Sequence, residues 1–220
     1  MKTLLLNYTN SKYKKISDLS KPNFIEFCNN NNFQYHLELL NSENPNECRL
    51  KKCELISNFL KNENFEYLIY SDVDILITNN KFDFWKSYEF SKDITFCKDE
   101  LGLCSGFIVI KNTEFSKLFF ETCVFLKSHK EQNCEVTESL KFWNGRYDKS
   151  SEADQELIKS LYYSYPHIRE NIDVNLPESI ISNPESSMED IKNSFAYHYW
   201  SRDIGIDHTV EKMNYYLNFI

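Results

Sequence analysis

The segment Glu66–Thr78 reads E-Y-L-I-Y-S-D-V-D-I-L-I-T, and it is the strongest structural signal in the chain. Tyr67–Tyr70 is a short apolar run of β-forming residues, which is typical of a strand buried on both faces. Asp72 and Asp74 follow it, and on extended backbone two side chains at this spacing point to the same side. Like charges in apolar surroundings are unfavourable unless a cation neutralises them, so the pair predicts a divalent metal site with oxygen ligands. The alternative is that both carboxylates cap the strand and face water.

The composition is that of a folded protein with no general affinity for polyanions. Charged residues make up 26% and hydrophobic residues 41% of the 220 residues, and a chain of this length can bury one substantial core. We therefore expect a single domain over residues 1–220. The net charge of −8 argues against a general attraction to nucleic acid or to an anionic membrane. An anionic small substrate would need a metal ion or a few well-placed Lys and Arg side chains.

The seven cysteines and the amino-terminal residues bear on the cellular compartment. The cysteine number is odd and no C-x-x-C pair occurs, which indicates neither a zinc ribbon nor a disulfide framework. Reduced thiols are the simpler interpretation. The apolar run after Lys2 is too short for a signal peptide, and no run approaches the roughly 20 apolar residues of a membrane span. The sequence therefore predicts a soluble cytoplasmic protein without a transmembrane segment.

Strand-like and helix-like patterns alternate along the chain. A helix is predicted to open at Ser20-Lys21-Pro22, because Ser can cap a helix and Pro is tolerated in its first turn. The alternation predicts a mostly parallel, doubly wound α/β sheet. Ligands of such sheets bind beyond the carboxyl ends of the strands, where Asn7–Asn10 and Asp72–Asp74 would lie. We expect strands at 3–6, 33–39, 67–70, 93–97, 105–110 and 195–200, and further helices at 47–61, 82–90, 113–129, 152–163 and 208–219.

Further polar motifs follow in a defined order. Cys104-Ser105-Gly106-Phe107 opens an aliphatic strand, Asp154-Gln155 lies in the first turn of a helix, and His198 comes near the end of the chain. Together with the Asp-x-Asp strand, these motifs resemble the GT-A glycosyltransferases from Thr3 to about Lys212. More narrowly, they resemble the nucleotide-diphospho-sugar transferases that include glycogenin-like and lipopolysaccharide galactosyltransferase-like enzymes. Two motifs depart from that family: Cys104 replaces the Asn of its usual Asn-Ser-Gly, and its His-x-x-Gly-x-x-Lys pattern is absent after His198.

The resemblance implies a GT-A fold, which is a Rossmann-like, mostly parallel mixed sheet flanked by helices. It also implies a metal-dependent enzyme that transfers a hexose from a nucleotide sugar, preferably a UDP-sugar, to a hydroxyl of a glycan or other acceptor. Mn²⁺ or Mg²⁺ would bridge the donor diphosphate and stabilise the departing nucleoside diphosphate as a Lewis acid. The implied metal ligands are Asp72, Asp74 and His198, and the implied catalytic carboxylate is Asp154. The implied nucleotide-sugar-binding residues are Asn7, Tyr8, Thr9, Lys52, Ser71, Asp72, Ser105, Gly106, Gln155 and Arg202.

Several of these residues also have simpler interpretations. Asp154 could stabilise the amino-terminus of its own helix through the helix dipole. His198 could be a histidine packed between the two tyrosines that flank it, and Lys52 could be a solvated helix lysine. Cys104 has no basic partner at a telling spacing, so a buried thiol is favoured over a nucleophile.

Two other functions remain open from the sequence. A haloacid-dehalogenase-like phosphatase or phosphotransferase would use Asp72 as nucleophile and Asp74 as general acid. That class prefers Thr or Val where this chain has Leu76, and it places its motif on the first strand. A non-catalytic nucleotide-sugar-binding module would bind the donor without releasing nucleoside diphosphate. Within the glycosyltransferase interpretation the resemblance favours retention of configuration, and Asp154 is the candidate general base if the enzyme inverts.

Overall fold

The computed structural model describes residues 1–42, 51–62, 64–80, 82–87, 89–99, 102–128, 154–176, 181–182, 189, 194–199 and 205–218. Within these ranges no helix is both long and apolar enough to cross a membrane. The elements are β1 (Thr3–Asn10), α1 (Lys14–Asn31), β2 (Gln34–Leu40), α3 (Lys52–Asn62), β3 (Tyr67–Ser71), β4 (Ile75–Ile77), α4 (Phe84–Ser87), β5 (Ile94–Asp99), β6 (Gly102–Lys111), α5 (Glu114–Ser128), α7 (Asp154–Ser164), α8 (Pro166–Arg169), β7 (Ile172–Leu176), β8 (Ile181–Ser182), β9 (Ala196–His198) and α11 (Ile206–Leu217).

The strands form two sheets. The larger has the order β2-β1-β3-β6-β5-β7, in which β1 pairs in parallel with β2 and β3, and β5 pairs in parallel with β7. β6 runs antiparallel to both β3 and β5. The predicted mixed, mostly parallel sheet is therefore confirmed. The smaller sheet has the order β4-β9-β8, and its antiparallel β4–β9 pair aligns Ile75 with His198.

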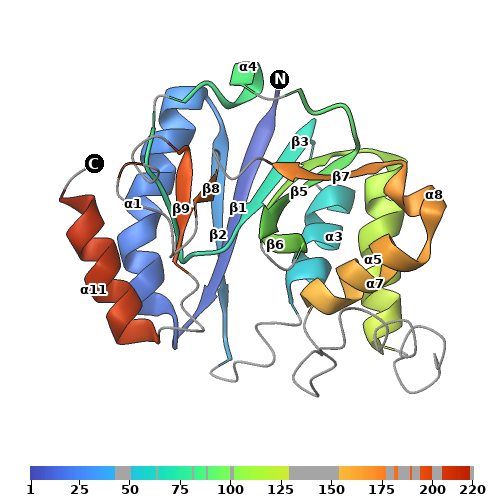
Figure 1. Ribbon diagram of the computed structural model, residues 1–220. Coiled ribbons are helices and arrows are strands. Elements are labelled where there is room, and N and C mark those ends of the chain that lie inside the picture. Colours follow the sequence, from blue (N-terminus) through green and yellow to red (C-terminus); the bar gives the residue numbers. More distant parts are fainter. Residues whose placement is uncertain are drawn as a thin grey trace.

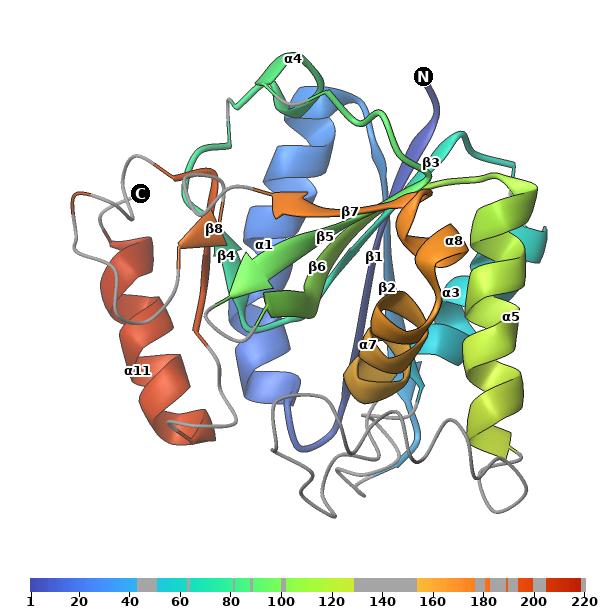
Figure 2. The same ribbon diagram turned by 45° about the vertical axis from the view of Figure 1, so that its right-hand side comes forward.

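Helices cover both faces of the larger sheet, as Figures 1 and 2 show. α3, α5 and α7 lie on one side, and α1 lies on the other with α11 packed against it. Side chains alternate between the two cores: Leu6 and Leu68 belong to the core beneath α3 and α5, whereas Leu5 and Ile69 belong to the core beneath α1. The central strands are thus buried on both faces, as their apolar runs predict.

The start of the first helix was predicted wrongly. α1 begins at Lys14, and Pro22 lies inside it instead of in its first turn. The helix face toward the core is continuous from Ile16 through Ser20 and Phe24, all of which are buried. This burial extends the helix back beyond Pro22, so tertiary packing outweighs the helix-start signal that the Ser-Lys-Pro sequence carries.

The backbone at the Asp-x-Asp motif also differs from the prediction. β3 ends at Ser71 and β4 begins at Ile75, and Val73 and Asp74 form a turn between them instead of extended backbone. The turn carries the chain from the larger sheet into the smaller one, because β3 pairs with β6 whereas β4 pairs with β9. Elements β4, β7, β8 and α8 were not predicted, and the first residues of the helices expected at 47–61 and 152–163 lie outside the described residues.

Candidate metal-binding and active site

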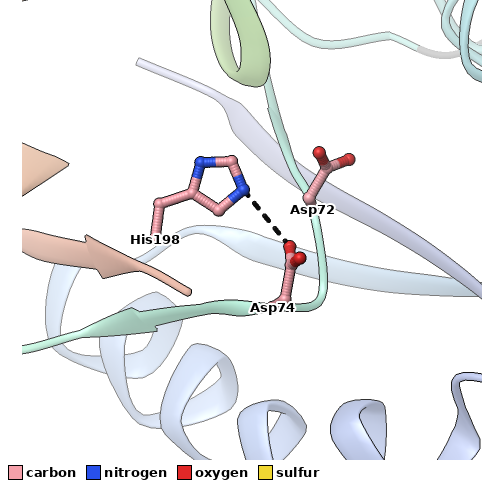
Figure 3. Close-up of side chains that lie close together, drawn as sticks. All are labelled: Asp72, Asp74 and His198. Atoms are coloured by element: carbon pink, nitrogen blue, oxygen red, sulfur yellow. Dashed lines mark ion pairs between the residues drawn. The ribbon is translucent and has the colours of Figure 1, made fainter. Parts of the chain in front are cut away.

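The turn after β3 and the end of β9 bring Asp72, Asp74 and His198 together. One candidate ligand atom from each residue lies within 4.8 Å of the other two. The Nε2 atom of His198 lies 3.4 Å from Oδ1 of Asp74, and Figure 3 shows the imidazole and this carboxylate pointing toward each other. The main chain fixes the arrangement, because the N–H of Tyr199 donates to the carbonyl of Asp74 at 2.9 Å.

The electrostatics of His198 follow from burial beside a carboxylate. The residue is only 7% exposed. Burial by itself lowers the pKa of the imidazole, but the charge of Asp74 and hydrogen bonds to Asp74 and to the Cys104 thiol raise that pKa to about 10. These contacts favour the protonated imidazole, and a metal ion bound by His198 would have to displace that proton.

Lys52 neutralises the other carboxylate of the motif. Its Nζ lies 3.1 Å from Oδ1 of Asp72, and it donates to the carbonyl oxygen of Ser105 at 2.8 Å and to the Ser105 hydroxyl at 3.2 Å. The ammonium also lies 4.8 Å from the centre of the Tyr70 ring, a cation–π distance. Burial lowers the pKa of Lys52, but Asp72 more than offsets this and raises it. The interpretation as a solvated helix lysine is wrong, since the residue is buried.

Tyr70 is a site residue that sequence reasoning missed. Its hydroxyl donates to Oδ1 of Asp72 at 2.5 Å, and its ring lies 5.8 Å from that of Tyr8. Burial and the neighbouring Asp72 charge raise the pKa of the phenol well above its usual value, so it remains a neutral donor. The sequence carried a signal for this contact, because Tyr70 precedes Asp72 by only two residues at the point where the apolar strand gives way to the polar motif.

The predicted Asp154-Gln155 motif begins α7 and reaches two neighbouring elements. Oε1 of Gln155 accepts from the backbone N–H of Ser105 at 2.9 Å and from its hydroxyl at 3.1 Å. Oδ2 of Asp154 accepts from the N–H of Cys53 at 3.1 Å, so this carboxylate contacts the first turn of α3. Asp154 is also the first residue of its own helix, α7. Its Oδ1 is buried and has no hydrogen-bond partner among the described residues. Burial raises the pKa of Asp154.

The predicted donor-binding residues at the end of β1 lie next to the metal motif. Nδ2 of Asn7 donates to the carbonyl oxygen of Ser71 at 2.6 Å, which ties β1 to the end of β3. Asn7, Thr9 and Ser71 are buried, whereas Tyr8 is half-buried. Oδ1 of Asn7 is buried without a hydrogen-bond partner in the described part of the chain. Arg202 lies outside the described residues.

Cys104 occupies the position at which the Asn-Ser-Gly motif of the resembling family has an asparagine. It is 6% exposed and lies opposite Cys97 in the β5–β6 pair. Its interaction with the Cys97 side chain, together with burial, raises the pKa of the Cys104 thiol well above its usual value, which disfavours a nucleophilic thiolate. All the cysteines in the described ranges are free and buried.

The fold of the chain is similar to that of solved glycosyltransferases. No protein-family model matches the sequence, and no curated protein sequence does. Among solved structures, the chain is similar to a glycosyltransferase involved in the glycosylation of the major capsid of PBCV-1, with a TM-score of 0.73 and 12% identity over 97% of this chain and 99% of that one. This likeness establishes the fold, and it confirms the fold predicted from the sequence.

Two further structures share the fold at lower similarity. The galactosyltransferase LgtC, solved in complex with donor and acceptor sugar analogs, matches with a TM-score of 0.55 and 12% identity over 96% of this chain and 95% of that one. The glycosyltransferase GlyE of Streptococcus pneumoniae TIGR4 matches with a TM-score of 0.54 and 12% identity over 99% of this chain and 62% of that one. The phosphatase alternative gains no support, because Asp72 and Asp74 follow β3 and not the first strand.

Proposed function

We propose that the chain is a metal-dependent glycosyltransferase. It transfers a hexose from a nucleotide sugar, preferably a UDP-sugar, to a hydroxyl of a glycan or other acceptor. The observation that carries this proposal is the cluster of Asp72, Asp74 and His198, whose candidate ligand atoms lie within 4.8 Å of one another at the end of a central strand. The glycosyltransferase neighbours support it, and one of them is described with donor and acceptor sugar analogs.

The donor atoms of the cluster fit Mn²⁺ or Mg²⁺. Two carboxylates and one imidazole offer oxygen ligands together with one nitrogen ligand, a set that Mn²⁺ accepts readily, and the two carboxylates suit Mg²⁺. Asp72, Asp74 and His198 would hold the ion. When bound, the ion supplies Lewis-acid stabilisation of the departing diphosphate.

The remaining residues bind and orient the donor in this proposal. Lys52 presents a buried positive charge beside Asp72 and thereby reduces the repulsion between an acidic site and an anionic donor. Gln155 fixes the backbone at Ser105, where β6 passes the metal cluster. Asp154 faces the donor sugar or activates the acceptor hydroxyl. In this proposal Asn7, Tyr8 and Thr9 of β1 bind the base, Ser71 and Gly106 contribute to binding the donor, and Arg202 binds the diphosphate.

The test is the release of nucleoside diphosphate from a panel of nucleotide sugars with Mn²⁺, in the presence of simple sugar acceptors. We expect release that EDTA abolishes and that Asp74→Asn lowers by at least about 100-fold, the scale of losing one electrostatic contact to the transition state. Asp18→Asn is the matched control, because Asp18 is an exposed carboxylate paired with Lys14 on α1. Donor binding without any release would instead identify a non-catalytic binding module, and release that EDTA leaves unchanged would contradict the metal assignment.

A further inference from the structure

Gly106 contacts two of the candidate metal ligands, each in a different way. Its carbonyl oxygen accepts the backbone N–H of Asp72 at 2.7 Å. A Cβ atom added to Gly106 would lie 2.5 Å from Cε1 of the His198 imidazole, 3.0 Å from Nδ1 and 3.2 Å from Nε2. Real Cβ atoms essentially never approach a neighbouring atom to within 3.0 Å. The imidazole in its present place therefore requires a residue without a side chain at position 106.

We propose that Gly106 is a positioning residue of the metal site. Its carbonyl holds the turn that carries Asp72, and its missing side chain lets the His198 ring reach Asp74. The metal-binding part of this inference rests on the proposed function, whereas the steric part rests on the structure without metal. Figure 3 shows the pair that the glycine makes possible, with the imidazole directed at the Asp74 carboxylate.

The His198 ring has little freedom to move aside and remain a ligand. His198 pairs with Ile75 of β4, and the two residues before it on β9 also pair with β8, so the strand backbone that carries His198 is held on both sides. The residue is 7% exposed, and its ring also interacts with the Cys104 thiol. A ring displaced from Gly106 would leave the position from which Nε2 now lies 3.4 Å from Oδ1 of Asp74.

The constraint at Gly106 is steric and not conformational. Positive φ angles occur at Gly102 and Gly205 among the described glycines, and not at Gly106. Alanine can therefore adopt the backbone conformation of residue 106, in an extended strand where its methyl group is the only addition. The cost of Gly106→Ala is then set by the contact with the ring of His198.

A double-mutant cycle separates this contact from other roles of the glycine. Urea unfolding of wild type, Gly106→Ala, His198→Ala and the double variant is measured in EDTA, so that no metal contributes. We expect Gly106→Ala to lower the unfolding midpoint in the wild-type background and to leave it nearly unchanged in the His198→Ala background. The control background is His36→Ala, which removes a half-exposed histidine on β2. In that background Gly106→Ala should lower the unfolding midpoint by as much as it does in wild type.

Mn²⁺ titration, followed by the loss of the free-ion electron paramagnetic resonance signal, tests the positioning role. We expect Gly106→Ala to weaken Mn²⁺ binding at least about tenfold, as the loss of an outer support of a metal ligand does, and to cause no further weakening in His198→Ala.

An equal stability loss in the wild-type and His198→Ala backgrounds, or full Mn²⁺ affinity in Gly106→Ala, would overturn the inference. If Gly106→Ala alone does not fold, recovery of a folded protein in the double variant supports the inference and continued failure to fold overturns it. Absence of Mn²⁺ binding by the wild-type chain would overturn the proposed function, while the stability cycle would still decide whether Gly106 makes room for His198.

Discussion

At the scale of single residues, two basic side chains, Lys52 and His198, lie against the two carboxylates of the candidate metal site. Each is a buried basic side chain that lies beside one carboxylate of the Asp-x-Asp turn, Lys52 beside Asp72 and His198 beside Asp74. Each carboxylate of the motif thus has a basic partner from the protein itself. The residues themselves predicted the two carboxylates as a pair, and the resemblance to a known family implied His198 as a third ligand. It could not predict the burial of Lys52, because its partners Asp72 and Ser105 come from distant parts of the chain.

We predict that Lys52→Met destabilises the fold while Lys51→Met does not. Removing the Lys52 ammonium leaves the partly buried Asp72 carboxylate with the Tyr70 hydroxyl but without its cation. We expect a loss of about 2–3 kcal/mol in the free energy of unfolding, somewhat less than for a fully buried pair because Asp72 is 30% exposed. Lys51 is 40% exposed and pairs with Glu54, so its substitution should change the stability by about 0.5 kcal/mol or less. Urea unfolding of the two variants checks this, and equal losses would contradict it.

At the scale of elements, Asp154 joins the beginnings of two helices. It is the first residue of α7, and its carboxylate accepts an N–H in the first turn of α3. The sequence predicted the helix and the position of Asp154 in its first turn. It could not predict the contact with α3, because Cys53 and Asp154 stand 101 residues apart and nothing local links them.

We predict that Asp154→Asn and Asp154→Ala differ in stability although both lower turnover. Asparagine can still accept the N–H of Cys53, whereas alanine leaves that donor unpaired, at a cost of about 1 kcal/mol. Burial raises the pKa of Asp154 above its unfolded value, so its contribution to stability is complete below the unfolded pKa and is lost as pH rises through the folded pKa. The Asn variant should therefore gain stability relative to wild type as pH rises. Unfolding free energies of wild type and Asp154→Asn, measured from below the unfolded pKa upward, check the trend. A free energy of unfolding of Asp154→Asn that falls relative to that of wild type as pH rises would contradict it.

The first helix gives a second prediction at this scale. Pro22 is exposed and lies inside α1, where it cannot donate the usual backbone hydrogen bond and its ring crowds the preceding turn. Pro22→Ala should therefore raise the free energy of unfolding, by on the order of 1–3 kcal/mol. Lys21→Ala is the control, since it changes an exposed neighbour with no such conflict. Lower stability of Pro22→Ala in a urea melt would show that the proline is accommodated without cost.

At the scale of the whole molecule, the sequence predicted the fold class and the sheet, but not how the two sheets meet. The alternation of apolar strands and amphipathic helices was sufficient for a mixed α/β fold. The smaller sheet was beyond prediction, because β4 and β8 are very short and β4 pairs with β9, a strand from the other end of the chain. That pairing brings His198 to Asp74, so the site depends on a strand pairing between residues far apart in the chain.

We also predict that the chain is a single domain and unfolds in one cooperative step. The core beneath α1 contains Leu5 of the larger sheet together with Ile75 and Ala196 of the smaller one, so the two sheets share buried surface. Unfolding followed by near-UV and far-UV circular dichroism should give coincident transitions. Two separated transitions would indicate that the sheets unfold independently.

The most direct measurement of the central claim is thermal stability with a panel of nucleotide sugars, each with Mn²⁺ and with EDTA. A ligand that binds the native state raises its stability by mass action, by about 2.7 kcal/mol at a hundredfold excess over the dissociation constant. We predict an increase in Tm with at least one nucleotide diphospho-sugar and Mn²⁺, its loss in EDTA, and its loss in Asp74→Asn. An equal increase in EDTA would contradict the metal site, and no increase with any donor would contradict the glycosyltransferase assignment.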